Sequence, residues 1–191
     1  ALRQGPLAIE DLAWRFLPSR LALGRAAFEV TGRVSGIAVR AEASRGIGEW
    51  QLRELKASGE AKAVAALHPL AATWDPAGTL EVDAALLTVA NSQVSGAATA
   101  EWREAGLAIS PVRPLGHWRA EVQAAGGPAT VKVTTLSGPL RFAGQGTLST
   151  EGRLAFAGEA RADPGRDGDL AAVLNLLGPR RADGAHAIDV R

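Results

Sequence analysis

The sequence predicts a mainly β protein: a single, strongly curved antiparallel meander sheet, half-barrel-like, with a short N-terminal helix and a C-terminal helix. Apolar and polar residues alternate with a period of two over most of the chain, which is typical of half-buried strands. The connections between these runs are short and rich in Gly and Pro, so they join neighbouring antiparallel strands. The 22 glycines in 191 residues exceed the usual share of about 7%, which favours an open, bent sheet over a deep sandwich.

The chain begins with a segment that predicts a short amphipathic helix over residues 6–16. Pro6 stands in a helix-opening position, and Leu12 and Phe16 have the i, i+4 spacing of one helical face. Pro18 is expected to end this helix because its ring cannot continue the hydrogen-bond pattern.

The next part of the chain predicts strands with irregularities. Residues 28–44 form either a hairpin or one bent strand broken at Gly32 or Gly36. Residues 47–56 alternate with slips at Gly48 and before Leu55, and slips of this kind indicate bulges.

The central part of the chain contains one ambiguous segment. Residues 61–67 are rich in Ala, which favours helix, but they lie between strand-like runs, so we expect a strand. A turn at residues 75–78 precedes a strand at 79–89, and Asn91 and Ser92 turn the chain again. Residues 94–103 and 107–109 then predict a hairpin around residues 104–106.

Residues 115–162 carry the clearest pattern, four consecutive antiparallel strands. In the first, Trp118, Ala120 and Val122 alternate with polar residues, and the following three runs repeat this rhythm. Gly and Pro mark the connections at residues 126–128, 137–139 and 151–152.

Glycines inside these strands predict where the sheet bends. Gly144 and Gly146 stand on the apolar face of their strand, where they carry no side chain to pack. We therefore expect the sheet to curve there.

The C-terminal part predicts a helix over residues 169–178. Asp169 is expected to cap it, Gly178 and the following proline to end it, and four apolar residues form one face, namely Leu170, Val173, Leu174 and Leu177. This face can cover apolar surface of the sheet on its concave side or at an open edge. Residues 186–190 predict a last strand.

Composition limits the function classes. The net charge is +1, with 21 basic and 20 acidic residues, so no strong field attracts nucleic acid, and no nucleic-acid partner is expected. No apolar run approaches the roughly 18 to 20 residues of a membrane span. Cys is absent, which excludes disulfides. We expect residues 1–191 to form a single domain, and because the chain has no Met and opens at Ala1, we expect a signal or a membrane anchor upstream.

Candidate chemistry is sparse. His68, His117 and His186 lie far apart in the sequence and have no metal-ligand spacing. The acidic side chains within residues 163–169 do not match the spacing of a calcium loop. The motif Gly144-x-Gly146 is not followed by a predicted helix that could hold a phosphate. We therefore expect no enzymatic activity, no cofactor and no metal site. The five tryptophans serve either core packing or contact with a partner.

Several segments, taken in order, resemble one known family. They include LAWRFLPSRLAL near the start, GEWQLREL around Trp50, VSGAATAEW, PVRPLGHWRAEV, TTLSGPLRFAGQGTL and LLGPRRADG. Together they are similar to general secretion pathway protein N, the N component of the bacterial type II secretion system. The positions that carry the resemblance, for which we expect structural roles, are Trp50, Trp102, Pro114, Leu115, Gly116, Trp118, Gly138, Gly144, Gly146 and Gly178. Ser35 departs from the family pattern, which has Trp there.

The resemblance implies an inner-membrane protein with one N-terminal anchor and a periplasmic β domain. It implies an accessory part of the secretion machine, with other type II secretion components as partners and the membrane reached through the missing anchor. A second function remains open: a periplasmic carrier of lipid or another apolar ligand, bound on the concave face of the sheet.

Overall fold

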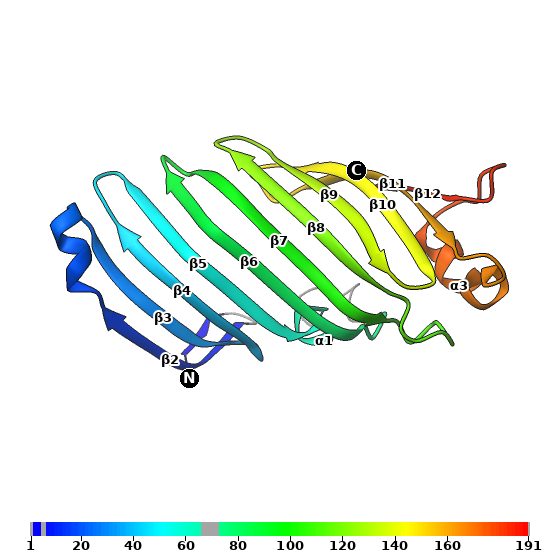
Figure 1. The fold of residues 1–191 in the computed structure, drawn as a ribbon, viewed down its shortest axis with the longest axis horizontal. Coiled ribbons are helices and arrows are strands. Elements are labelled where there is room, and N and C mark those ends of the chain that lie inside the picture. Colours follow the sequence, from blue (N-terminus) through cyan, green and yellow to red (C-terminus); the bar gives the residue numbers. More distant parts are fainter. Residues whose placement is uncertain (1, 5–6, 66–72, 191) are drawn as a thin grey trace.

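In the described part of the chain, twelve antiparallel strands form one open sheet in which spatial order equals chain order. A computed structural model describes residues 2–4, 7–65 and 73–190, with backbone alone described up to residue 9. Each strand pairs with the next along the chain, which confirms the predicted meander (Figure 1). The strands are β1 (Leu2–Gln4), β2 (Leu7–Phe16), β3 (Ala26–Val34), β4 (Ile37–Arg45), β5 (Glu49–Glu60), β6 (Ala77–Ala90), β7 (Gln93–Gly106), β8 (Gly116–Ala125), β9 (Ala129–Ser137), β10 (Leu140–Leu148), β11 (Leu154–Ala162) and β12 (His186–Val190).

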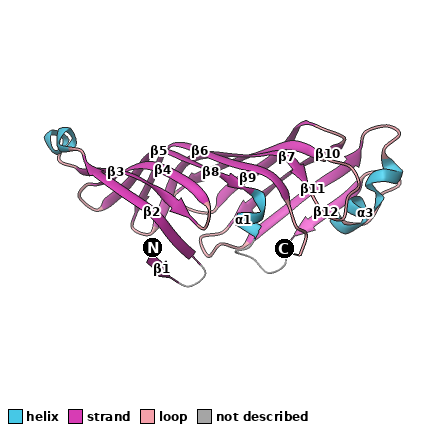
Figure 2. Ribbon diagram, turned by 90° about the horizontal axis from the view of Figure 1, so that it is seen from below, coloured by secondary structure: helices cyan, strands magenta, loops and turns pink. Residues whose placement is uncertain are grey.

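The sheet is a long, twisted layer that curls back on itself at its C-terminal end. Figure 1 shows β11 and β12 passing behind β9 and β10, and Figure 2 shows them below β10 when the molecule is seen from beneath. This is the part of the sheet where Gly144 and Gly158 lie opposite each other. Because glycine allows the two backbones to approach closely, these positions suit a sharp bend.

The N-terminal helix predicted for residues 6–16 is wrong, because residues 7–16 form β2, while residue 6 lies outside the described part of the chain. Residues 13–16 pair in register with β3, so Trp14 and Phe16 follow the period of a strand. Asp11 has a φ of 51° at a shift in register, and this bulge disturbs the alternation that would have revealed the strand. A 3-10 helix, η1 (Pro18–Leu23), begins where the predicted helix was expected to end.

The strand predicted for residues 61–67 is also wrong where it can be compared. Residues 61–65 form the short helix α1 (Ala61–Ala65), which matches the helix preference of Ala, and residues 66–67 lie outside the described part of the chain. Ala61 and Ala65 are buried on one turn.

Other irregularities are placed as follows. Residues 28–44 form a hairpin, with Ser35 and Gly36 at the turn between β3 and β4. The slip before Leu55 is a bulge: Glu54 has a φ of 49°, and the pairing of β4 with β5 shifts there.

The hairpin predicted around residues 104–106 is wrong. β7 continues through Glu104, which has a φ of 49° at a bulge, and ends at Gly106. The chain then crosses to β8 through residues 107–115, so Ile109 belongs to a loop and not to a strand.

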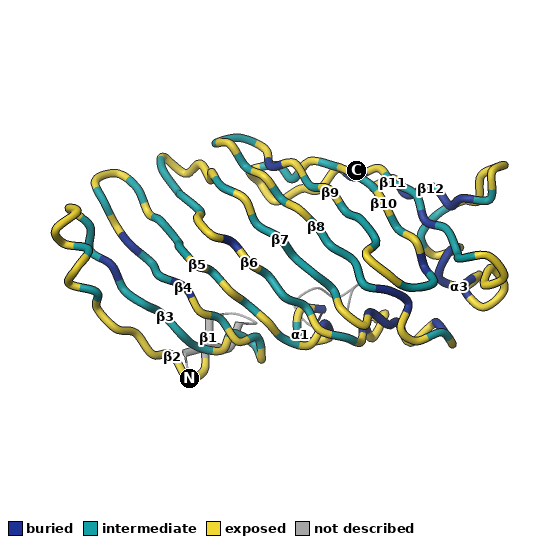
Figure 3. Tube along the Cα trace, in the orientation of Figure 1, coloured by how far each residue is buried: buried dark blue, intermediate teal, exposed yellow. Residues whose placement is uncertain are grey.

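The C-terminal helix is confirmed as α3 (Asp167–Leu177), and it covers apolar surface beside β11 and β12. Its predicted cap is wrong: Arg166 is the N-cap residue without a side-chain hydrogen bond, and Asp169 lies in the first turn, where a carboxylate favours the helix dipole. Figure 3 shows that buried positions gather near α3, while most of the sheet is half-buried or exposed.

Candidate functional site

Two tryptophans on neighbouring strands lie in contact on one face of the sheet. Trp102 of β7 lies opposite Trp118 of β8, with ring centroids 5.3 Å apart and the rings inclined by 70°. The Trp102 indole N–H donates to the carbonyl oxygen of Ala77 at 2.9 Å, and that of Trp118 donates to Leu140 at 3.2 Å. The indole donors are thus satisfied by backbone, and the rings present only apolar surface.

Helix α3 packs beside this pair and forms the main hydrophobic core. Leu170 and Val173 of the helix are almost fully buried, as is Leu115 just before β8. The core consists of Leu107, Leu115, Leu140, Phe156, Ala160, Leu170, Val173, Leu174 and Ile188. This core fixes one side of a hollow whose other side is the tryptophan pair.

The hollow between the tryptophan pair and α3, here called the tryptophan pocket, has a volume of about 270 Å³. Trp74 at the pocket is 46% exposed, so a large apolar ring meets solvent there. The pocket is lined by Trp74, Leu80, Ala100, Glu101, Trp102, Leu107, Trp118, Ala120, Val133, Leu140, Phe142, Val173 and Leu177. Such a surface can receive an apolar side chain or a hydrocarbon group.

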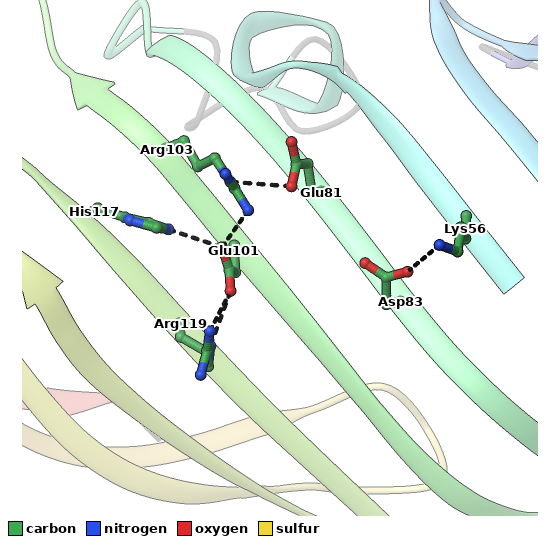
Figure 4. Close-up of polar contacts among 7 residues, drawn as sticks. All are labelled: Lys56, Glu81, Asp83, Glu101, Arg103, His117 and Arg119. Atoms are coloured by element: carbon green, nitrogen blue, oxygen red, sulfur yellow. Dashed lines mark hydrogen bonds and ion pairs between the residues drawn. The ribbon is translucent and has the colours of Figure 1, made fainter.

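A network of ion pairs centred on Glu101 links β6, β7 and β8 (Figure 4). Arg119 donates two hydrogen bonds to Oε1 of Glu101, at 2.6 and 3.0 Å. Oε2 lies 2.9 Å from Nε2 of His117 and 3.0 Å from Arg103, which also pairs with Glu81 at 3.0 Å. The hydrogen bonds from Arg119 and His117 hold the pKa of Glu101 below its ordinary value.

This network joins strands and does not present a reactive group. The two carboxylate oxygens of Glu101 already accept bonds from cations or from His117, and its side chain is only 13% exposed. A carboxylate that is held in its ionised form by such partners is a poor general base.

Three further candidate residues from the sequence, His186, Asp163 and Asp169, have partners within the fold. His186 lies with Nδ1 2.9 Å from the carbonyl oxygen of Gly178, and His68 lies outside the described residues. Asp163 pairs with Arg141 at 2.7 Å, and Asp169 lies 3.4 Å from Arg166. Among the described residues, no group of three or more His, Cys, Asp or Glu side chains is arranged to hold a metal ion.

The family positions fall into separate places in the fold. Trp102, Leu115 and Trp118 meet around the tryptophan pocket and the core. Pro114 directly precedes Leu115 and follows Arg113 in a cis peptide bond. Trp50 lies apart at the start of β5, with the guanidinium of Arg45 4.9 Å from its ring centroid.

The glycines among the family positions allow close backbone contacts. Gly138 has a φ of 111°, and a Cβ there would collide with the backbone of Gly116. A Cβ on Gly144 would lie 2.5 Å from the ring of Phe156, and Gly146 faces the backbone of β11 in the same way. Gly178 has an extended backbone and lies against Ala187.

Sequence reasoning missed the Glu101 network and the role of Trp74. Glu101 and Arg103, like His117 and Arg119, occupy alternate positions on one strand face, so this pattern was a usable signal. The pairing of β7 with β8 in this particular register, which brings the four together, was not readable from either strand alone.

A second hollow, of about 850 Å³, lies across β8 to β12 and is lined mainly by polar or small residues. They include Glu121, Gln123, Lys132, Gln145, Thr147 and Asp189. The lining of this second hollow is more polar than that of the tryptophan pocket.

Comparisons with known proteins bear on the identity of the chain. The family model described as type II secretion system (T2SS), protein N, matches residues 1–189. Neither the comparison with curated proteins nor the comparison with solved structures found a match. Among the described residues, no helix has the length and apolar character needed to cross a membrane. Because the match covers nearly the whole sequence, the chain that folds into this open meander sheet belongs to the family of type II secretion system protein N.

Proposed function

We propose that this chain is a non-catalytic, periplasmic docking component of the type II secretion system, carried by an inner-membrane protein. Membership of the family implies an accessory component of that system. The observation that supports docking is the tryptophan pocket, where Trp74 is 46% exposed beside a hollow with an apolar lining. Exposed aromatic rings at a pocket are typical anchors for a protein partner.

The ion pairs around Glu101 support a structural role for this cluster more than a catalytic one. Glu101 is engaged by His117, Arg103 and Arg119, so this half-buried polar cluster links neighbouring strands. A rigid sheet that keeps its apolar pocket in place serves recognition without a reacting group.

The test is a pull-down with the full-length, membrane-anchored protein from secreting cells. We expect wild-type protein to recover at least one other secretion component, and Trp74→Ala to recover several-fold less while its melting temperature stays unchanged. Trp50→Ala is the matched control because Trp50 is 47% exposed but lies away from the pocket. A wild-type pull-down that recovers no secretion component contradicts the proposal.

An apolar-ligand carrier is the second candidate function, and the same pocket favours it. The indole N–H groups of Trp102 and Trp118 donate to backbone carbonyls, so the rings offer a ligand no hydrogen bond. A hydrocarbon chain would fit such a lining. Native mass spectrometry of the chain after exposure to a bacterial lipid extract distinguishes the two: a retained lipid favours the carrier, and a ligand-free mass excludes it.

A further inference from the structure

The two ends of the open sheet are covered to different extents. On the outer side of β12, Pro179 accepts a hydrogen bond from the Ala187 N–H at 2.9 Å, and Arg180 forms a bridge with His186. On the outer side of β2, β1 pairs only with residues 7–9. Within the described residues, no strand covers β2 from Glu10 onward, and Figure 3 shows this stretch as exposed.

The direction of the backbone groups along this edge follows from one hydrogen bond. The N–H of Leu17 donates to the carbonyl oxygen of Ala27 at 2.9 Å. Because hydrogen-bonded positions alternate along an antiparallel pair, Ala13 and Arg15 also direct their backbone groups toward β3. Leu12, Trp14 and Phe16 therefore direct theirs outward, and such an edge can pair with another strand.

The side chains of the same three residues are large, apolar and exposed. Leu12 is 51% exposed, Trp14 67% and Phe16 39%. Their alternate positions place them on one face of the sheet, beside Phe28, whose ring centroid is 5.7 Å from that of Trp14. An added strand would gain most if it carried apolar groups on that same face.

We propose that β2 pairs antiparallel with β2 of a second copy of this chain, with Ala13 opposite Ala13 at a two-fold axis. The segment Asp11-Leu12-Ala13-Trp14-Arg15 is complementary to itself in this register. Each Leu12 lies opposite a Trp14. Each Arg15, which also pairs with Glu29 of its own chain, comes next to the bulge of the other copy, where Asp11 lies. Leu12 and Trp14 both direct their backbone groups outward, so they form hydrogen-bonded pairs across the axis.

Charge selects this register and this partner. A shift that places Trp14 opposite Trp14 would put Arg15 opposite Ala13 and Asp11 opposite Leu17, so the two charge pairs would be lost. The two-fold arrangement uses the same surface on both copies, and it therefore closes at a dimer in which each exposed edge covers the other.

Charge reversal tests the pairing on the purified chain by analytical ultracentrifugation. Wild type is expected to dimerise as its concentration rises. Asp11→Arg and Arg15→Asp are each expected to dimerise at least tenfold more weakly, because each places like charges opposite one another. An equimolar mixture of the two variants restores opposite charges at both positions and is expected to form a heterodimer. A loss of folding in one variant cannot produce this restoration.

Cross-linking tests the register. The sequence has no Cys, so Ala13→Cys introduces a single thiol at the proposed axis, where two Cα atoms of a non-hydrogen-bonded pair lie about 4.5 Å apart. We expect a disulfide-linked dimer under mild oxidation. Ser58→Cys, an exposed position on β5, is the control and should remain largely monomeric.

Two results would overturn the proposal: a wild-type chain that stays monomeric up to its solubility limit, or a variant mixture that fails to form the heterodimer. These measurements contain no secretion component. A failure here therefore leaves the proposed docking role intact, and a failed pull-down leaves the dimer intact.

Discussion

At the scale of single residues, Phe156 explains why glycines stand inside two neighbouring strands. Gly144 and Gly158 lie opposite each other on β10 and β11. The Phe156 ring lies across them and stacks with Phe142 at a centroid distance of 5.8 Å. Any side chain on these glycines would occupy the space of the ring, so the sequence pattern of glycines on the apolar face records a packing requirement.

Replacing Gly144 by Ala should destabilise the fold by about 1 to 3 kcal/mol, because the new Cβ would lie 2.5 Å from the Phe156 ring and 2.7 Å from the Ala157 oxygen. Gly168→Ala in α3 is the matched control, since a Cβ there meets nothing within 4 Å, and it should stabilise by about 0.5 to 1 kcal/mol. Urea unfolding measures both. Equal effects of the two substitutions would refute the packing role of Gly144.

Glu101 should make stability depend on pH. Its folded pKa lies below the ordinary value of 4.5, because Arg119 and His117 bond to its ionised form. The stabilisation is therefore complete above that ordinary value and is lost as pH falls through the folded pKa. We expect Glu101→Gln to cost about 1 to 2 kcal/mol at neutral pH, with the deficit shrinking in acid. Chemical unfolding across the acidic range measures this.

The control for this prediction is Glu121→Gln, at an exposed position on β8, which should change stability by less than about 0.5 kcal/mol at every pH. A deficit for Glu101→Gln that does not change between neutral and acidic pH would show that the ionised carboxylate is not the source of the stabilisation.

At the scale of elements, the sequence predicted the strands whose alternation is unbroken and misassigned those with bulges. The runs that became β8 to β11 alternate cleanly, and each forms the expected strand. β2 was mistaken for a helix because the bulge at Asp11 interrupts its alternation. β7 was cut short because Glu104 and Gly106 read as a turn, although pairing with β6 extends the strand.

Helix α3 was predictable because its apolar residues repeat with helical spacing and Gly178 follows them. What it covers was not predictable, since the core it completes combines side chains from β10, β11, β12 and the loop at Leu107. Distant strands contribute to it only after the sheet has formed and curled.

Truncation in α3 tests its packing. Leu170→Ala should destabilise the chain by about 2 to 5 kcal/mol, because Leu170 is fully buried and its removal leaves a cavity in the core. Leu176→Ala, on the same helix but 44% exposed, should change stability by less than about 0.5 kcal/mol. Thermal unfolding compares them, and similar losses for both would mean that the helix face is assigned incorrectly.

At the scale of the whole molecule, short connections dictate an ordered meander, and the sequence therefore predicted the order of the strands. It did not predict the two surfaces that bear on function. The tryptophan pocket joins residues from Trp74 to Leu177, and the open edge of β2 depends on how far β1 extends. Both depend on strand register and on what covers each surface, which local patterns do not encode.

The central claim is that the apolar face at the tryptophan pocket receives a secretion component. Site-specific photo-cross-linking in secreting cells tests this claim most directly, with a photoreactive residue in place of Trp74. The control places the photoreactive residue at Lys132, which lines the second hollow across β8 to β12. We predict cross-links to another secretion component from the Trp74 position and none from Lys132. Cross-links from Lys132 alone, or from neither position, would contradict the account.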